Sequence, residues 1–269
     1  MNVKDLNDSS AKRRLLITAA IAAPLLALAA PVFATHSWST YHWKRTTQEI
    51  SPPIGDNVTA QWDSHLAVAV ADWNQSTVIN SPLVAGSAGN ARKCRAVAGT
   101  IQVCNSTYGN NGWLGIASIW LSGGHISQGT TKLNDTYFNT PQYNTPSWRA
   151  LVTCQEVAHD YGLDHQDENF TNPNLGTCMD YTNNPAGNEH PNAHDYQQLL
   201  TVYNHIESAM VAQQGPASNE SGETPAEWGR AVRFDRQGRP NVFERDEGQG
   251  RKVVTHVFWA IGEGPRNNR

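Results

Sequence analysis

Residues 154–165 read Cys-Gln-Glu-Val-Ala-His-Asp-Tyr-Gly-Leu-Asp-His, and Cys-Met-Asp-Tyr follows at 178–181. Gln155 and His159 are four residues apart, so on a helix both side chains project from one face and can reach one metal ion. Gly162 accepts a left-handed conformation at low cost, which predicts the helix end and a sharp turn that returns His165 as a third ligand. Three protein ligands leave one position open, as a catalytic zinc site requires.

Glu156 follows the first of these positions, where its carboxylate could take a proton from a metal-bound water and pass it to a leaving amine. The stretch matches the zinc-peptidase pattern H-E-x-x-H-x-x-G-x-x-H with a downstream Met-turn, except that Gln155 replaces the first histidine. It resembles the active site of a metzincin metallopeptidase, closest to the matrixin-like members. The resemblance is specific from Cys154 to Tyr181 and continues as a weaker pattern from about Tyr41 to Ile206.

This resemblance implies an α+β, zincin-like domain with a twisted, mixed five-stranded sheet and three main helices. It implies zinc held by Gln155, His159 and His165, with Glu156 as the general base. Met179 would lie beneath the metal, and Tyr181 would approach it. The implied function is a secreted zinc-dependent metalloendopeptidase that cleaves an extended peptide or protein substrate.

Gln155 leaves several interpretations open, because an amide oxygen is a weaker zinc ligand than imidazole. The site could work with the Gln155 oxygen as ligand, or with Tyr181 or a water in its place. It could be degenerate, or hold a metal that prefers oxygen. His125 is a candidate replacement ligand, although an ordinary strand or turn role is the simpler interpretation.

Two further function classes follow if the site is degenerate. One is a catalytically inactive metzincin-fold protein that serves as an extracellular peptide- or protein-binding module. The other is an envelope protein in which the domain is a scaffold for the C-terminal strands. Loss of hydrolysis in Glu156→Ala would support the enzyme, whereas peptide binding that a chelator leaves unchanged would support the module.

The first 34 residues have the form of a signal peptide. Lys12, Arg13 and Arg14 precede an apolar run, and Val32-Phe33-Ala34 predicts cleavage after Ala34. The compact Ala- and Leu-rich core suits a bacterium, and Arg13-Arg14 is compatible with twin-arginine export. An uncleaved anchor is the alternative, since about 20 apolar residues can span a bilayer. After cleavage we expect a secreted or cell-envelope protein without membrane contact.

Net charge and composition limit the classes of partner that we expect. The net charge of -4 and the pI near 6.2 give no basic field, so nucleic acid is not an expected partner. Only 16% of the residues are charged, which favours a loop-rich extracellular surface. The expected state is a monomer.

Four cysteines in an exported chain should form disulfides. Pairing of near neighbours favours Cys94 with Cys104 and Cys154 with Cys178. The second bond would join the metal helix to the Met-turn. A structural zinc site built from these thiols is not supported by their spacing.

The remaining chain divides into a domain at 35–212, a Gly-, Pro-, Ser- and Glu-rich linker at 213–227 and a β-rich C-terminal segment at 228–269. The expected elements are an opening strand within 37–50, a helix after Asp56-Asn57, strands at 96–104, 113–121 and 125–133, helices beginning at Pro146 and Pro191, and C-terminal strands at 229–235, 241–245 and 253–260.

Three strands alone would be marginal, so the C-terminal segment should pack on the main domain or on a partner. Residues 115–121 are the predicted edge strand that pairs with substrate. The Asn- and Asp-containing loop between His165 and Cys178 makes a calcium site conceivable, although the same residue types form turns. His190, His194 and His205 are expected at the surface or in packing.

Overall fold

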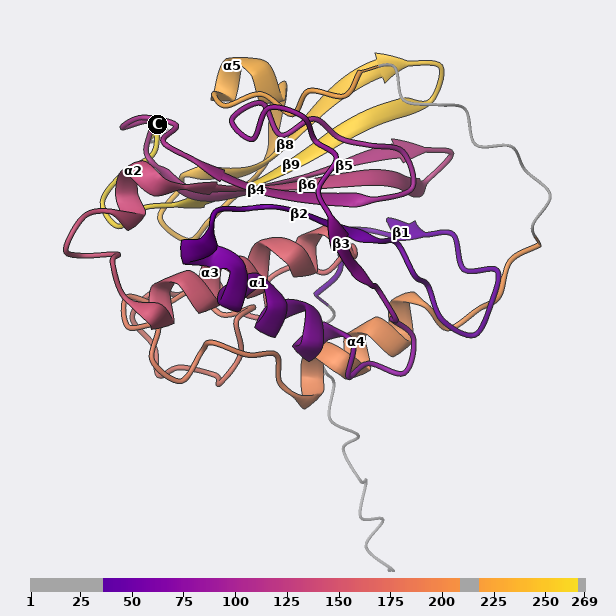
Figure 1. Ribbon diagram of the computed structural model, residues 1–269, viewed down its shortest axis with the longest axis horizontal. Helices are drawn as coiled ribbons and strands as arrows, with labels where there is room; N and C mark the ends of the chain where they lie inside the picture. Colours follow the sequence, from indigo (N-terminus) through magenta and orange to yellow (C-terminus); the bar gives the residue numbers. More distant parts are fainter. Residues whose placement is uncertain (1–35, 209–217, 266–269) are drawn as a thin grey trace, which may run out of the picture. The chain divides into compact units, whose positions relative to one another are not determined.

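The computed structural model describes residues 36–208 and 218–265 (Figure 1). The predicted signal peptide and positions 213–217 of the predicted linker lie outside these residues. Within them, the elements are β1 His42–Trp43, β2 Ile54–Asn57, α1 Ala60–Trp73, β3 Leu83–Ala85, β4 Ile101–Ser106, β5 Trp113–Ser122, β6 His125–Asn134, α2 Asp135–Phe138, α3 Pro146–Asp160, α4 Ala193–Val202, α5 Pro225–Trp228, β7 Arg230–Phe234, β8 Pro240–Gly248 and β9 Arg251–Trp259.

One mixed sheet runs through the described residues in the order β3-β2-β4-β6-β5-β9-β8-β7, and β1 pairs with the start of β6. The contacts among β1, β2, β3, β4 and β6 are parallel, and those from β6 through β5, β9 and β8 to β7 are antiparallel. The α+β class with a mixed sheet is therefore confirmed. The predicted five strands are too few, because β2 and β3 are too short to show a pattern and β7, β8 and β9 join the same sheet.

Helices α1, α3 and α4 lie on one side of this sheet, and α5 lies on the other (Figure 1). The main core fills the helical side. On the opposite face, Trp228 of α5 packs with Trp113, Phe243 and Trp259 in a second cluster. The C-terminal strands therefore have apolar side chains buried on both faces of the sheet, which ties them to the main domain as expected.

The helix boundaries follow local signals in two of three cases. Pro146 opens α3, and the Thr145 hydroxyl accepts a hydrogen bond from the Trp148 amide at 3.2 Å. Asn192 caps α4. The helix predicted after Asp56-Asn57 is α1, but these two residues belong to β2 and do not cap it, since the N-cap is Thr59.

Two predicted strand positions also shift. The opening strand is only the two residues of β1, and β4 begins at Ile101 instead of residue 96. Residues preceding Ile101 form turns, including Gly99 with a φ of 77°. The strands β5 and β6 are confirmed within one residue.

The predicted substrate edge is not an edge. β5 pairs with β6 on one side and antiparallel with β9 on the other, with Gly115 opposite Phe258 and Ser122 opposite Arg251. The hydroxyls of Ser118 and Thr255 lie 2.9 Å apart across this junction. An extended substrate cannot add to β5 in this arrangement because the chain's own strand already occupies the position.

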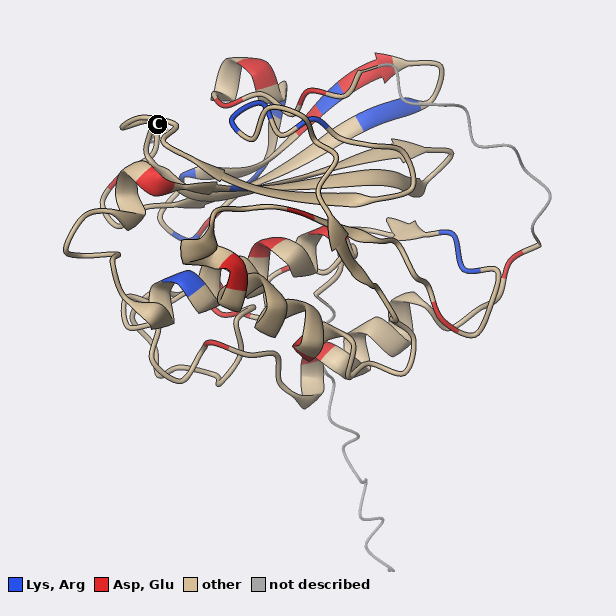
Figure 2. Ribbon diagram, viewed as in Figure 1, with Lys and Arg blue, Asp and Glu red and all other residues tan. Residues whose placement is uncertain are grey.

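Charged residues of both signs lie along β8 and β9 (Figure 2). Lys252 lies 3.4 Å from Glu244, and Arg245 lies 3.1 Å from Glu247. No helix in the described ranges is long and apolar enough to cross a membrane.

Candidate metal centre

Helix α3 carries the motif residues and is buried from Leu151 to Asp160. Gly115 of β5 permits its close approach to the sheet, since a Cβ there would lie 2.7 Å from Cγ of Glu156 and 2.8 Å from Cγ1 of Val152. A larger residue at this position would push the helix away from β5. The sheet and the helix together therefore hold Glu156 in place.

Gly162 turns the chain after α3 as predicted. Its φ is 86°, and a Cβ at this position would collide with the carbonyl oxygen of Tyr41. The turn returns His165 toward His159, and the two Nε2 atoms lie 3.1 Å apart. The turn therefore brings the two histidines together, and their role as metal ligands remains a prediction.

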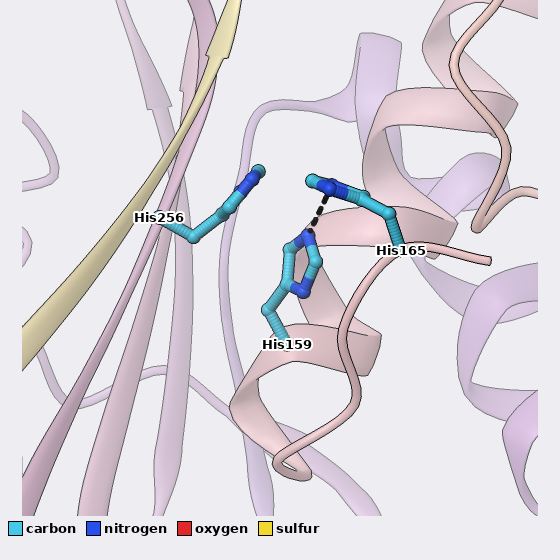
Figure 3. A group of neighbouring side chains, drawn as sticks. All are labelled: His159, His165 and His256. Carbon is cyan, nitrogen blue, oxygen red and sulfur yellow. Dashed lines mark hydrogen bonds between the residues drawn. The ribbon is translucent and has the colours of Figure 1, made fainter. Parts of the chain in front are cut away.

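A third histidine, His256, completes the group. It projects from β9 toward His159 and His165 (Figure 3), and one donor nitrogen from each of the three lies within 4.8 Å of the others. The ring centroids of His159 and His256 are 3.9 Å apart. Sequence reasoning missed His256, because strand pairing alone brings it to α3.

The far side of each ring faces an acceptor. Nδ1 of His159 donates to the carbonyl oxygen of Leu163 at 2.8 Å, and Nδ1 of His165 lies 3.0 Å from Oε1 of Glu168. Nδ1 of His256 lies 3.7 Å from Oε2 of Glu156. The acceptors beside His159 and His165 orient these two rings and leave their Nε2 atoms available to a metal, whereas Nε2 of His256 lies 3.2 Å from the Tyr181 hydroxyl.

Glu168 is ionised in this arrangement. Burial would raise its pKa, but the hydrogen bond and charge of His165, together with Arg233, lower it to about 2. Asn241 also donates to Glu168 Oε1 at 3.0 Å. An ionised carboxylate only accepts, so Nδ1 of His165 must carry the proton.

The two facing Nε2 atoms of His159 and His165 therefore both present lone pairs when the rings are neutral. Burial, followed by the neighbouring imidazoles, lowers the pKa of His159 and of His256 well below the usual imidazole value, which favours the neutral form. Two lone pairs at 3.1 Å repel unless a proton or a metal ion lies between them. The donor set thus fits a transition metal such as zinc, for which neutral imidazole is a preferred ligand.

Gln155, the predicted first ligand, makes a different contact. Its Nε2 donates to the carbonyl oxygen of Cys178 at 2.6 Å, so it fastens the helix to the Met-turn. Its Oε1 is buried without a hydrogen-bond partner among the described residues. A ligand role for Gln155 remains a prediction.

Glu156 is fully buried, and neither carboxylate oxygen has a hydrogen-bond partner of normal geometry in the described part of the chain. Burial, followed by the nearby Asp160 charge, raises its pKa well above the usual value. Burial at this position therefore favours the protonated over the ionised form of the carboxyl group.

Tyr181 joins the centre as predicted, with its hydroxyl 3.2 Å from Nε2 of His256 and its ring 4.2 Å from that of His165. Burial raises its pKa well above the usual value, so the hydroxyl stays protonated and able to donate. Met179 is fully buried in the core, and its predicted place beneath the metal remains a prediction. Trp38 stacks on His159 with ring centroids 5.0 Å apart, a cover that sequence reasoning missed.

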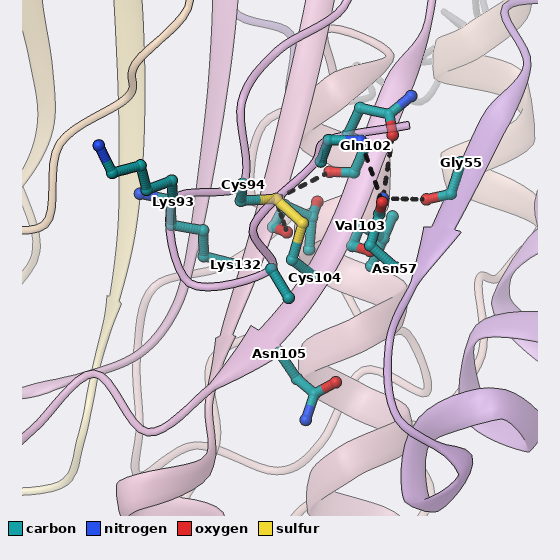
Figure 4. Close-up of a disulfide and its surroundings, with 12 residues drawn as sticks. Gly55, Asn57, Lys93, Cys94, Gln102, Val103, Cys104, Asn105 and Lys132 are labelled. Carbon is teal, nitrogen blue, oxygen red and sulfur yellow. Dashed lines mark hydrogen bonds between the residues drawn. A yellow bond between two sulfur atoms is a disulfide. The ribbon is translucent and has the colours of Figure 1, made fainter. Parts of the chain in front are cut away.

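Both predicted disulfides form. Cys154–Cys178 joins α3 to the Met-turn, and Cys94–Cys104 joins a loop to β4 beside Gln102 (Figure 4). Both fit an oxidising compartment outside the cytoplasm.

The other predicted or candidate ligands lie in different surroundings. His125 contacts Glu207 with Nε2 and Oε1 2.6 Å apart. In the loop after His165, Asp167 accepts from the backbone amides of Glu168 and Asn169, which is a turn role. Calcium binding there remains a prediction.

Neither protein-family models nor curated proteins match this chain.

Proposed function

We propose that this protein is an exported, zinc-dependent endopeptidase in which His159, His165 and His256 hold the metal. The supporting observation is the 3.1 Å approach of two Nε2 atoms whose rings both donate through Nδ1. His256 supplies the imidazole that the motif lacks at Gln155. Three neutral nitrogen ligands leave a position for substrate or water, as in catalytic zinc sites.

A bound zinc ion would act as a Lewis acid on the scissile carbonyl and on water. In its ionised form, Glu156 would take the proton from water and deliver it to the leaving amine. Its Oε2 lies 3.7 Å from Nδ1 of His256, close to the ring but beyond hydrogen-bond distance. The Tyr181 hydroxyl, close to His256, would donate to the developing oxyanion.

A non-catalytic, metal-stabilised binding module is the second candidate. The pairing of β5 on both sides weighs against the endopeptidase, because it removes the strand edge that an extended peptide substrate would use. Trp38 on His159 and the complete burial of Glu156 also restrict access. In this case zinc would stabilise the fold without hydrolysis.

The first experiment compares two variants of the chain from residue 35 onward, His256→Ala and Gln155→Ala, by zinc titration. We expect His256→Ala to weaken zinc binding at this centre by more than about 100-fold, beyond the usual effect of losing a group that only orients a ligand. Gln155→Ala should change zinc affinity much less, because the Gln155 side chain donates to the carbonyl oxygen of Cys178. If Gln155→Ala weakens zinc binding strongly and His256→Ala does not, Gln155 is the ligand and His256 is excluded.

The second experiment measures hydrolysis of a peptide library by the zinc-loaded chain and by Glu156→Gln. We expect Glu156→Gln to keep zinc and lose at least about 100-fold in rate, the usual contribution of an acid–base group. A wild-type chain that holds zinc at the three histidines yet cleaves no peptide would favour the binding module. Equal rates in the two proteins would exclude the role assigned to Glu156.

A further inference from the structure

A second group of histidines lies away from the centre described above. His42 comes from β1, His125 opens β6, and His205 and Glu207 follow α4. The register of the parallel pair β1–β6 places His42 opposite His125. The amide of Glu207 donates to the carbonyl oxygen of Arg45 at 2.8 Å, which holds the segment after α4 beside β1.

All three imidazoles direct Nε2 at one carboxylate oxygen. Oε1 of Glu207 lies 2.6 Å from Nε2 of His125, 3.5 Å from Nε2 of His205 and 3.6 Å from Nε2 of His42. The ring of His42 meets those of His125 and His205 edge-on, with centroids 4.9 and 5.1 Å apart.

The hydrogen bonds on the far side of the rings decide which nitrogens carry lone pairs. Nδ1 of His42 lies 2.6 Å from the carbonyl oxygen of Thr40, and Nδ1 of His205 lies 3.0 Å from the side-chain oxygen of Asn204. Both nitrogens must donate, because these oxygens only accept. In the neutral rings the Nε2 atoms of His42 and His205 then present lone pairs toward an acceptor oxygen.

This convergence needs a positive charge. Nε2 of His42 and Oε2 of Glu207 are buried atoms without a hydrogen-bond partner among the described residues. Lone pairs from two imidazoles and a carboxylate repel one another unless a proton on an imidazole or a bound cation neutralises them. One donor atom from each of His42, His205 and Glu207 lies within 4.8 Å of the others. Tetrahedral zinc with ligands at about 2.0–2.1 Å separates its donors by roughly 3.3–3.4 Å.

We propose that His42, His205 and Glu207 form a second zinc site, in which His125 orients the carboxylate through its hydrogen bond to Oε1. Ligands from β1 and from the segment after α4 would be fastened together by the ion, so the site stabilises the packing of that segment. A hollow of about 310 Å³ borders His42 and His205 and gives the ion a path from solvent. This site shares no residue with the three-histidine centre.

The test is zinc stoichiometry of the chain from residue 35 onward, with Co²⁺ absorption as a probe of the ligand set. We expect two ions per wild-type chain and one in His205→Ala, which should fold because the His205 side chain is 47% exposed. Glu207→Gln should likewise bind one ion, and His159→Ala should lose the other ion. His190→Ala, another exposed histidine paired to a carboxylate, should retain both.

The two proposals fail separately. A loss of zinc in His205→Ala with the centre at His159 intact would support the second site, whether or not the chain cleaves peptides. The second site is overturned if wild-type chain binds zinc only at positions that His159→Ala abolishes. It is also overturned if His205→Ala and Glu207→Gln bind as many ions as wild type with unchanged Co²⁺ spectra.

Discussion

The substitution Phe258→Ala tests whether the C-terminal strands unfold together with the main domain. Its side chain lies in β9, is 1% exposed, and packs in the main core with its ring centroid 5.1 Å from that of Tyr181. Phe258→Ala would remove the transfer free energy of a buried ring, about 1.5–3 kcal/mol, and leave a cavity. The total should be about 4 kcal/mol, within the usual range for buried Phe→Ala changes.

The assay is urea unfolding followed by tryptophan fluorescence and far-ultraviolet circular dichroism, at a fixed zinc concentration because bound metal adds to stability. One cooperative transition should move for both signals, with Tm lowered by about 10 °C in a parallel thermal scan. Phe234→Ala is the matched control. Phe234 lies in β7 and is 40% exposed, so its loss should change the free energy of unfolding by less than about 1 kcal/mol.

Two results would refute this reasoning. Phe258→Ala could split the transition, with a weak early step for the C-terminal strands and an unmoved main step. Alternatively, it could cost no more than Phe234→Ala. Either result would mean that the C-terminal strands form a separate unit, contrary to the pairing of β9 with β5.

Three other predictions concern stability. Replacing Cys154 and Cys178 together by Ser should lower the free energy of unfolding by about 3 kcal/mol, because the disulfide closes a loop with a separation of 24 residues. Denaturant titration of the oxidised wild type and of the variant measures this difference. Gly123→Ala should lower the free energy of unfolding by about 1 kcal/mol, because Gly123 has a positive φ. Gly162→Ala should lower it by more, because Gly162 has a positive φ and backbone atoms also occupy the space of a Cβ there. Equal Tm changes in the two variants would contradict this. Lys132 is buried, and burial lowers its pKa to about 8. As the pH rises, the Lys132 ammonium group therefore loses its proton in the folded state at a lower pH than in the unfolded state. Stability of wild type relative to Lys132→Met should therefore rise between pH 8 and about 10.5 and stay flat below, as urea titrations across pH would show.

Several features of the candidate site were predictable because they depend on neighbours in sequence. The spacing of Gln155 and His159 follows from helix geometry, and the return of His165 follows from the left-handed conformation of Gly162. The Cys154–Cys178 bond joins near neighbours. Pro146 also marked the beginning of α3.

The assignment of Gln155 shows where this reasoning ends. A motif identifies which positions share a helix face, and it cannot show that Gln155 donates to Cys178 or that another element supplies an imidazole. Strand alternation in β9 places His256 on a face of the sheet, but it does not say which strand is the neighbour. The short β2 and β3 lacked enough residues for any pattern to emerge.

The amino-acid sequence by itself thus determined the α3 helix, the turn at Gly162, the disulfide pairs and the α+β class, since each results from contacts over short separations or from composition. Only the tertiary structure decided that β9 covers β5, that His256 meets His159 and His165, and that His42, His125, His205 and Glu207 converge. The physical reason is that backbone hydrogen bonding is the same for almost any pair of strands, so the packing of the whole chain selects which strands pair. Residues distant in the chain are brought together only when that selection is made.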